Sequence, residues 1–316
     1  MIKQRQVFYF GESQVAYTLF STEQGDLESK ANNSVSRRIM LLHGAGVAGE
    51  LTWTFIANYL KHWDEVLVPD LLGMGQSFFE SSDQLEFSIE NICHSLFGLL
   101  RHLHWSDFDL VGYSLGGLVA LELNAEARCE LGHDSSPDTL IHSLCLIEPA
   151  LFSDHSLQSA LNFRQSFVPL AANIKSEPHN DQHFIDFLDL VSPNRKRSEQ
   201  VDKMAIQRLQ LRPLGFAHAL AAVSDYADKL DEFKLQHLIA SIPRGLGIVG
   251  GLSNPGLLLA QQKIQRQLHG FKDSRSHSSN PPQGERWHIE SLANTDHSLV
   301  YVRPKVVANL INEYLG

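Results

Sequence analysis

One serine is flanked by glycines at the spacing that an exposed nucleophile needs. Gly112, Ser114 and Gly116 form a Gly-x-Ser-x-Gly pentapeptide. The apolar run at residues 108–111 is typical of a buried strand, and the run at 118–127 is compatible with a helix. A serine on a sharp strand-to-helix turn has strained backbone dihedrals, and the two glycines prevent side-chain collisions around it. The pentapeptide therefore predicts an activated hydroxyl, although an ordinary glycine-rich turn with an idle serine has the same pattern.

A second glycine-rich stretch has the spacing of a dinucleotide-binding loop. Gly44, Gly46 and Gly49 form Gly-x-Gly-x-x-Gly, and Asp70 ends the following strand-like segment, near where a ribose-binding acid would stand. A NAD(P)-dependent oxidoreductase is therefore an alternative. Three features argue against it: two strand-like segments precede the motif, His43 stands directly before the first glycine, and the serine pentapeptide would be left without a role.

Segments with strand character alternate with segments of helical periodicity along most of the chain. The expected strands cover residues 7–10, 15–20, 38–42, 65–68, 108–111, 140–147, 244–249 and 287–292. The expected helices outside the middle of the chain cover residues 52–60, 88–104, 118–127, 257–268 and 306–314. This alternation predicts an α/β fold with a mostly parallel sheet that helices cover on both faces.

Three motifs stand in a recognisable order after consecutive strands. His43-Gly44 follows the third expected strand, Asp70-Leu-Leu-Gly-Met-Gly-Gln-Ser77 the fourth, and Gly112-Tyr-Ser-Leu-Gly-Gly117 the fifth. With these motifs the chain resembles the α/β-hydrolase superfamily, in its cap-bearing branch of esterases, C–C bond hydrolases and haloalkane dehalogenases. The resemblance is clearest over residues 7–149.

The resemblance implies a fold and a first set of site residues. The fold would be an eight-stranded, mostly parallel α/β-hydrolase sheet flanked by helices. Ser114 would be the nucleophile, since the dehalogenases of this branch carry aspartate at that place. The backbone N–H groups of Ala45 and Leu115 would form the oxyanion hole.

The middle of the chain departs from the alternation of strands and helices. Residues 157–170, 184–191, 203–211 and 215–230 have helical character, with no strand-like run between them. A helical block inserted after a strand at the active-site edge is typical of a lid. We therefore expect an α/β-hydrolase core at residues 1–149 and 239–316 and a helical cap at 150–238, whose phenylalanines form mostly its own core.

The general base is expected after the last strand. His297 follows the expected strand at residues 287–292 and precedes the terminal helix. The superfamily places its base there, and the order of serine before histidine agrees with it. His297 would take the Ser114 proton during attack and return it to the leaving group.

The acid of the triad is missing from its usual place. The family carries it after the strand at 244–249, but the turn Gly250-Gly-Leu-Ser-Asn-Pro255 contains no carboxylate. Some members of the branch carry the acid after the strand that follows the nucleophile helix, which is Glu148 here. A carboxylate at the end of a buried strand is costly unless it is paired, and His297 would supply the partner. Asp296 is the second candidate, but adjacent side chains rarely face each other with triad geometry.

Composition argues against several classes of partner. The net charge of −10 and the lack of a basic run argue against a nucleic-acid groove or an anionic lipid surface. The odd set Cys93, Cys129 and Cys145 fits free thiols in a reducing compartment. The first residues precede no long apolar run, so we expect neither a signal peptide nor a membrane span, and a cytoplasmic location. We also expect no metal, no cofactor and a small-molecule partner.

These observations predict a serine hydrolase with Ser114, His297 and Glu148 as its catalytic residues. The reaction would be acyl transfer from a small, apolar ester to water through an acyl-enzyme. The alternative from another class is a non-catalytic ligand-binding protein on a hydrolase scaffold, which the missing carboxylate after residue 249 favours. Neither substrate identity nor oligomeric state follows from the sequence.

Overall fold

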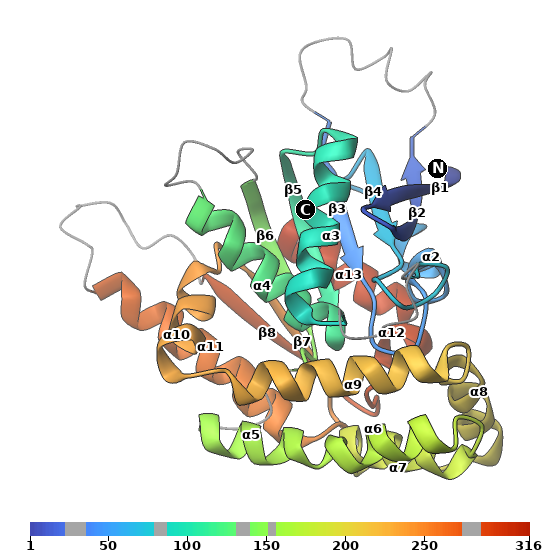
Figure 1. Cartoon of the computed structure of the whole chain (residues 1–316). Helices are drawn as coiled ribbons and strands as arrows, with labels where there is room; N and C mark the ends of the chain where they lie inside the picture. The colour runs from blue at the N-terminus through green and yellow to red at the C-terminus, as the bar shows by residue number, and fades with distance from the viewer. Residues whose placement is uncertain (23–35, 79–86, 131–139, 151–155, 274–285) are drawn as a thin grey trace.

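A single eight-stranded sheet organises the molecule (Figure 1). The computed structural model describes residues 1–22, 36–78, 87–130, 140–150, 156–273 and 286–316. The strands are β1 (Ile2–Phe10), β2 (Ser13–Ser21), β3 (Arg38–Leu42), β4 (Glu65–Pro69), β5 (Asp107–Tyr113), β6 (Leu140–Ile147), β7 (Gly245–Gly250) and β8 (Trp287–Leu292). Their order is β1-β2-β4-β3-β5-β6-β7-β8. The pairs β1–β2 and β2–β4 are antiparallel and all others are parallel, which confirms the predicted mostly parallel sheet.

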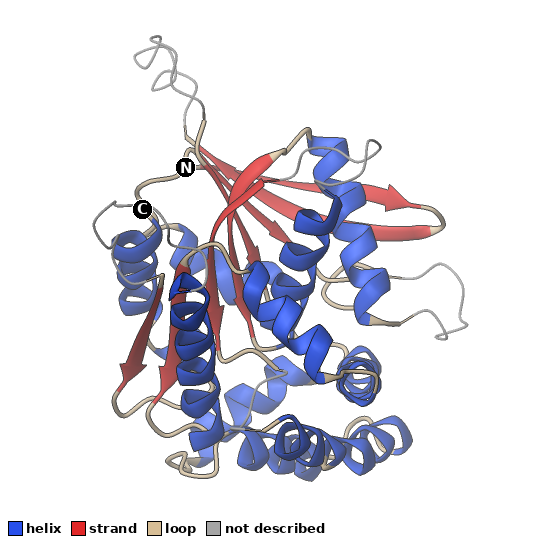
Figure 2. Cartoon of the chain, turned by 90° about the vertical axis from the view of Figure 1, so that its left-hand side faces the viewer, coloured by secondary structure: helices blue, strands red, loops and turns tan. Residues whose placement is uncertain are grey.

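Helices cover both faces of this sheet, as the alternation predicted (Figure 2). One face packs against α3 (Ile89–Leu103), α4 (Leu115–Glu130), α10 (Glu232–Ser241) and α11 (Pro255–Asp273). The other face packs against α2 (Gly49–Ala57), α12 (Leu299–Val302) and α13 (Pro304–Leu315). None of the described helices is both long and apolar enough to cross a bilayer.

Strand side chains alternate between these two layers of helices. In β3, Ile39 and Leu41 are buried on the α2 side, whereas Met40 and Leu42 are buried on the α3 side. This is the period of two that a strand imposes, and because both faces are buried the strand is apolar throughout. The parallel strands therefore lie in a fixed register, and their carboxyl ends meet at one edge.

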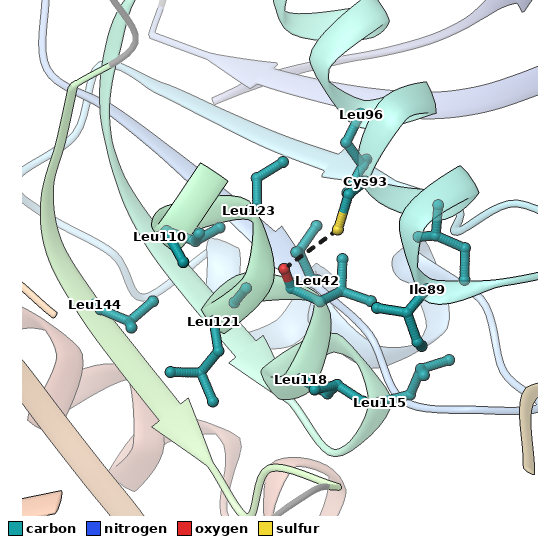
Figure 3. Close-up of a cluster of buried hydrophobic side chains, with 14 of the residues drawn as sticks. Leu42, Ile89, Cys93, Leu96, Leu110, Leu115, Leu118, Leu121, Leu123 and Leu144 are labelled. Atoms are coloured by element: carbon teal, nitrogen blue, oxygen red, sulfur yellow. Dashed lines mark hydrogen bonds between the residues drawn. The ribbon is translucent and has the colours of Figure 1, made fainter. Parts of the chain in front are cut away.

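The α3–α4 side of the core contains one of the free thiols (Figure 3). Cys93 of α3 is directed toward α4, and its Sγ lies 3.8 Å from the Val119 carbonyl oxygen. Burial raises the pKa of Cys93 and of Cys145 above their ordinary values. Both thiols therefore stay protonated at neutral pH and pack as small apolar side chains.

Five helices lie across the carboxyl ends of the strands, at the bottom of Figure 1. They are α5 (Leu157–Gln165), α6 (Phe167–Ser176), α7 (Asp181–Val191), α8 (Glu199–Leu209) and α9 (Pro213–Asp228), and we call them the helical layer. The layer has a core of its own, in which Phe184 stacks on Phe216 and Phe187 meets the same ring edge-on. The phenylalanines of the middle segment thus pack largely among themselves.

The middle segment differs from the expected elements in two places. The single helix expected at residues 157–170 is broken at Ser166, whose hydroxyl donates to the Phe163 carbonyl. The helix α10 was not expected, and it packs beside the sheet against α4 and α11. The division into a core and a cap at residues 150–238 stays a prediction.

Candidate active site

Ser114 occupies the sharp turn that joins β5 to α4. Its φ of 55° lies in the left-handed region, where few residues other than glycine are found. A Cβ at Gly112 would lie 2.2 Å from the Gly116 carbonyl oxygen, and a Cβ at Gly116 would lie 2.3 Å from the Leu42 carbonyl oxygen. Only glycine fits at either position, because backbone atoms approach from the facing segment. The spacing of the pentapeptide thus has the steric cause that the sequence predicted.

Ser114, His297 and Glu148 form one continuous hydrogen-bonded chain. The Nε2 of His297 lies 3.1 Å from the Oγ of Ser114, and its Nδ1 lies 2.5 Å from the Oε2 of Glu148. The other carboxylate oxygen of Glu148 accepts the Gly250 amide at 2.6 Å. Glu148 is only 1% exposed and His297 only 8%, so bulk water competes little for these bonds. The structure therefore brings together all three side chains that the sequence singled out.

Glu148 stands directly after β6, beside the β7 turn where a carboxylate is missing. Its φ of 46° is left-handed, and its amide donates to the Ile248 carbonyl of β7 at 3.1 Å. This strained backbone aims the carboxylate across the end of β7 toward His297. Asp296 lies elsewhere, because its Oδ1 accepts the Ser298 amide at 2.8 Å. In the β7 turn, the Oδ1 of Asn254 accepts the Gly256 amide at 2.9 Å.

Two side chains that the sequence did not single out position His297. The buried hydroxyl of Tyr113 donates to the His297 carbonyl at 2.7 Å, and the two rings lie 5.1 Å apart. The His297 amide donates to the Oγ of Ser192 at 2.9 Å. Tyr113 belongs to the pentapeptide, where its position accepts any residue type, and Ser192 follows α7 without a motif. The sequence therefore gives no indication that either residue positions His297.

His43 orients the peptide that carries the Ala45 amide. Its Nε2 accepts the Leu71 amide at 2.8 Å, so its Nδ1 carries the proton and donates to the Gly44 carbonyl at 2.7 Å. That carbonyl and the Ala45 N–H belong to the same peptide plane. Burial lowers the pKa of His43, against the opposing effects of Asp70 and the Gly44 carbonyl, which keeps the ring neutral. Among the described residues, the Ala45 and Leu115 amides have no hydrogen-bond partner.

The first and second glycines of the Gly-x-Gly-x-x-Gly stretch pack against neighbouring side chains. A Cβ at Gly44 would lie 3.0 Å from the Tyr113 ring. Gly46 has a φ of 74°, and a Cβ there would lie 2.8 Å from the Phe216 ring. The spacing of these glycines is thus explained by packing beside the serine turn.

Asp70 is held by the backbone around it. It is 3% exposed, and its carboxylate accepts the amides of Gly49 at 2.7 Å and of Gln76 at 2.9 Å. Its own carbonyl accepts the Ser77 hydroxyl at 2.7 Å. Arg5 lies 3.3 Å from the same carboxylate. An acid with these partners braces two loops, and it does not present free oxygens to a ribose.

The reacting groups face two adjoining cavities under the helical layer. The first has a free volume of about 40 Å³ and is lined by Gly44, Ala45, Val47, Tyr113, Ser114, Phe187, Leu188, Ala205, Arg208, Leu209, His297, Ser298 and Tyr301. The second has a free volume of about 30 Å³ and is lined by Ala45, Ser114, Leu115, Glu148, Ala150, Phe163, Arg164, Phe187, Val191, Ala219, Leu220, Val223, Asn254, Leu257 and His297. Both are mostly apolar, and both reach Ser114, His297 and Ala45.

Among the described residues, no group of three or more His, Cys, Asp or Glu side chains is arranged to hold a metal ion. His179 and His183 have His-x-x-x-His spacing, but the Nε2 of His183 lies 3.3 Å from a Glu177 carboxylate oxygen. That contact closes a local turn on the surface of the helical layer.

A family model matches most of the chain, and solved structures share its fold. A family model described as "Alpha/beta hydrolase family" matches residues 39–310. Among solved structures, a candidate lipase from Acinetobacter baumannii AYE superposes with a TM-score of 0.68, at 15% identity over 97% of this chain and 89% of that one. An esterase from Thermogutta terrifontis superposes with a TM-score of 0.65, at 18% identity over 98% and 97% of the two chains. At these identities the likeness shows the fold.

Curated relatives match over a shorter stretch. The magnesium-chelatase 30 kDa subunit of Rhodobacter capsulatus is 33% identical over 85 residues, which cover 27% of this chain and 29% of that protein. The 2-hydroxy-6-oxo-2,4-heptadienoate hydrolase of Pseudomonas putida F1 is 31% identical over 85 residues, which cover 26% and 30%. The matches thus span less than a third of either relative.

Proposed function

Because the chain belongs to the alpha/beta hydrolase family, we propose that it is a serine hydrolase that cleaves a small ester through an acyl-enzyme. The observation that carries the proposal is the buried chain of hydrogen bonds from Ser114 through His297 to Glu148, which opens onto two cavities. A nucleophile, a base and an acid that orients the base are the three parts of this chemistry.

Acylation follows from the direction of these bonds. As the Oγ of Ser114 attacks the ester carbonyl carbon, its proton passes to the Nε2 of His297, 3.1 Å away. Glu148 accepts the Nδ1–H of His297, which selects the tautomer with a free Nε2 and stabilises the imidazolium that forms. The tetrahedral intermediate then expels the alcohol, which receives the proton from Nε2. Water repeats the sequence on the acyl-enzyme and releases the acid.

The oxyanion of the tetrahedral intermediate would be held by two amides. Ala45 and Leu115 both line the second cavity together with Ser114. Leu115 begins α4, so the positive end of that helix adds to its N–H. His43 holds the Gly44–Ala45 peptide in one orientation through the Gly44 carbonyl. Loss of one such donor typically lowers turnover by about 10²–10³.

Glu148 as the acid would account for the missing carboxylate that favoured a non-catalytic binding protein. That alternative rested on the turn after β7, which has no carboxylate. Glu148 reaches the same histidine from the end of β6, next to that turn. The apolar lining of both cavities favours a small substrate with apolar parts on each side of the ester. The helical layer that roofs these cavities would act as the cap.

An active-site phosphonate tests the proposal directly. A fluorophosphonate reacts only with an activated serine, and intact mass spectrometry counts the adducts. We expect one adduct on the wild-type protein, none on Ser114→Ala, and one on Ser176→Ala, which changes an exposed serine of α6. Hydrolysis of p-nitrophenyl butyrate should follow the same order. A folded wild-type protein that takes up no phosphonate and turns over no ester would contradict the proposal.

A further inference from the structure

Arg164 is a buried charge beside the reacting groups. It lies on α5, is 6% exposed, and lines the second cavity together with Ser114 and His297. Its guanidinium lies over two aromatic rings, 5.2 Å from the centroid of Phe163 and 4.9 Å from that of Phe167. Its Nε is buried and has no hydrogen-bond partner among the described residues.

The other buried charges in the described part of the chain are paired, which sets Arg164 apart. Asp70 accepts two amides, and Asp109 accepts the Trp63 ring N–H at 2.7 Å. Glu122 accepts both the Tyr226 hydroxyl at 2.6 Å and the Lys234 ammonium at 2.7 Å. An ion taken out of water without a partner costs several kcal/mol, and two aromatic faces offset only part of that cost.

Arg164 nevertheless stays charged under ordinary conditions. Burial lowers its pKa to about 9, so the guanidinium carries its proton at neutral pH. Among the described residues no carboxylate compensates this cation, so an anion that enters the cavity would supply the missing partner.

The described lining of the second cavity offers no spare negative charge. Glu148 is the carboxylate of that lining, and its two oxygens are bound by His297 and the Gly250 amide. Asn254 also lines the cavity, and its Oδ1 is occupied by the Gly256 amide, so the group it has left to offer is its NH₂. The polar side-chain groups that the second cavity offers to a ligand, the Arg164 guanidinium and the Asn254 NH₂, are therefore hydrogen-bond donors in an otherwise apolar lining.

We propose that Arg164 binds a carboxylate of the substrate, so that the enzyme cleaves esters which carry a carboxylate on the side that enters the second cavity. The inference rests on the proposed serine hydrolase function. A planar guanidinium matches a carboxylate with two parallel hydrogen bonds, and one cation with one amide suits a monoanion better than a phosphate dianion. The apolar walls would hold the carbon chain between that carboxylate and the ester.

Matched pairs of esters test whether the enzyme prefers a substrate with a carboxylate, and on which side of the ester that carboxylate lies. Mono-p-nitrophenyl glutarate has a carboxylate at the end of its acyl chain, where p-nitrophenyl pentanoate has a methyl group. The esters 4-carboxyphenyl butyrate and 4-methylphenyl butyrate differ by one on the alcohol side. We expect Arg164→Met to lower kcat/KM about 10–100-fold more for the carboxylate member of one pair than for its neutral partner. Arg164→Lys keeps the positive charge but cannot form two parallel hydrogen bonds. Its kcat/KM for the carboxylate ester should therefore lie between those of the wild-type protein and Arg164→Met.

A second arginine provides the control. Arg128 is half-buried in α4, where it donates to Asn124 and to the Ile141 carbonyl, far from either cavity lining. Arg128→Met should leave the preference for carboxylates as in the wild-type protein. The carboxylate-bearing product of the affected pair, glutarate or 4-hydroxybenzoate, should raise the Tm of the wild-type protein and not that of Arg164→Met.

Three results would overturn the inference. One is an equal loss on charged and neutral esters, and another is no loss on either carboxylate ester. The third concerns Asp154, which lies outside the described residues: if Arg164→Met and Asp154→Asn lower the Tm by the same amount, that carboxylate is the partner of the arginine. Fluorophosphonate labelling of Arg164→Met separates the two proposals, because normal labelling leaves the serine hydrolase standing while the substrate class fails.

Discussion

Glu148→Gln tests the unusual place of the acid. Glutamine has the size of glutamate, but one of its two polar atoms is an NH₂ group. In the wild-type protein both carboxylate oxygens accept, from the Nδ1 of His297 at 2.5 Å and from the Gly250 amide at 2.6 Å. Because the Gly250 N–H is fixed in the backbone, the glutamine oxygen must face it, and the NH₂ must face His297.

The histidine then has to change its tautomer. An Nδ1 that accepts from the glutamine NH₂ leaves the proton on Nε2, where it can no longer receive the one from Ser114. A tautomer error of this kind lowers kcat by about 10⁴ in serine proteases. We therefore expect a loss of about 10³–10⁴, or about 4–5.5 kcal/mol of transition-state stabilisation at 1.36 kcal/mol for each tenfold change.

Three measurements make the test decisive. Steady-state hydrolysis of p-nitrophenyl butyrate gives kcat, thermal unfolding shows that Glu148→Gln is folded, and the rate of fluorophosphonate labelling reports the activation of Ser114. Asp296→Asn is the matched control, because Asp296 adjoins His297 in sequence but accepts the Ser298 amide. A folded Glu148→Gln with kcat within tenfold of the wild-type value would refute the reasoning, and so would an equal loss in Asp296→Asn.

Other contacts of the site lead to three further predictions. Because burial lowers the pKa of His43 below its ordinary 6.5, the unfolded chain binds a proton there that the folded chain refuses, so the free energy of unfolding should fall as the pH drops below about 6.5. In His43→Gln, urea titrations at pH 7.5 and pH 5 should show a smaller difference. Gly112→Ala places a Cβ 2.2 Å from the Gly116 carbonyl oxygen and should cost about 2–3 kcal/mol of stability, and an unchanged urea midpoint would count against this steric account. Tyr113→Phe removes the hydrogen bond to the buried His297 carbonyl and should cost about 1 kcal/mol in the same titration, with a lower kcat; equal kcat values would show that the hydroxyl does not position the base.

The parts of the site that depend on neighbours in sequence were predictable. The turn at Ser114 is defined by glycines two residues away, and their spacing is visible in the chain. His297 and Glu148 lie 149 positions apart, yet both follow a strand, and parallel strands end at one edge. The resemblance to the α/β-hydrolase superfamily indicated the roles of these two residues, and the parallel sheet explains why they meet.

The parts that depend on packing between distant segments were not predictable. The Tyr113 hydroxyl reaches a carbonyl 184 positions away, and the Ser192 hydroxyl reaches an amide 105 positions away. Neither residue type nor spacing indicates such contacts. The same holds for Arg164, because an arginine in an amphipathic helix is normally solvated and its burial results from the packing of α5 against α9.

The hydrogen bond from the His297 amide to Ser192 limits which helical layers could replace the one in this protein. Ser192 directly follows α7 of the helical layer. The helical layer therefore provides one of the hydrogen bonds that hold the loop around His297 in place. The neighbouring Val191 carbonyl also accepts the Asn254 amide, in the turn after β7. A chimaera that exchanges residues 156–230 for the corresponding segment of another hydrolase would change substrate access and base alignment together. Such a graft needs a hydroxyl or another acceptor where Ser192 stands.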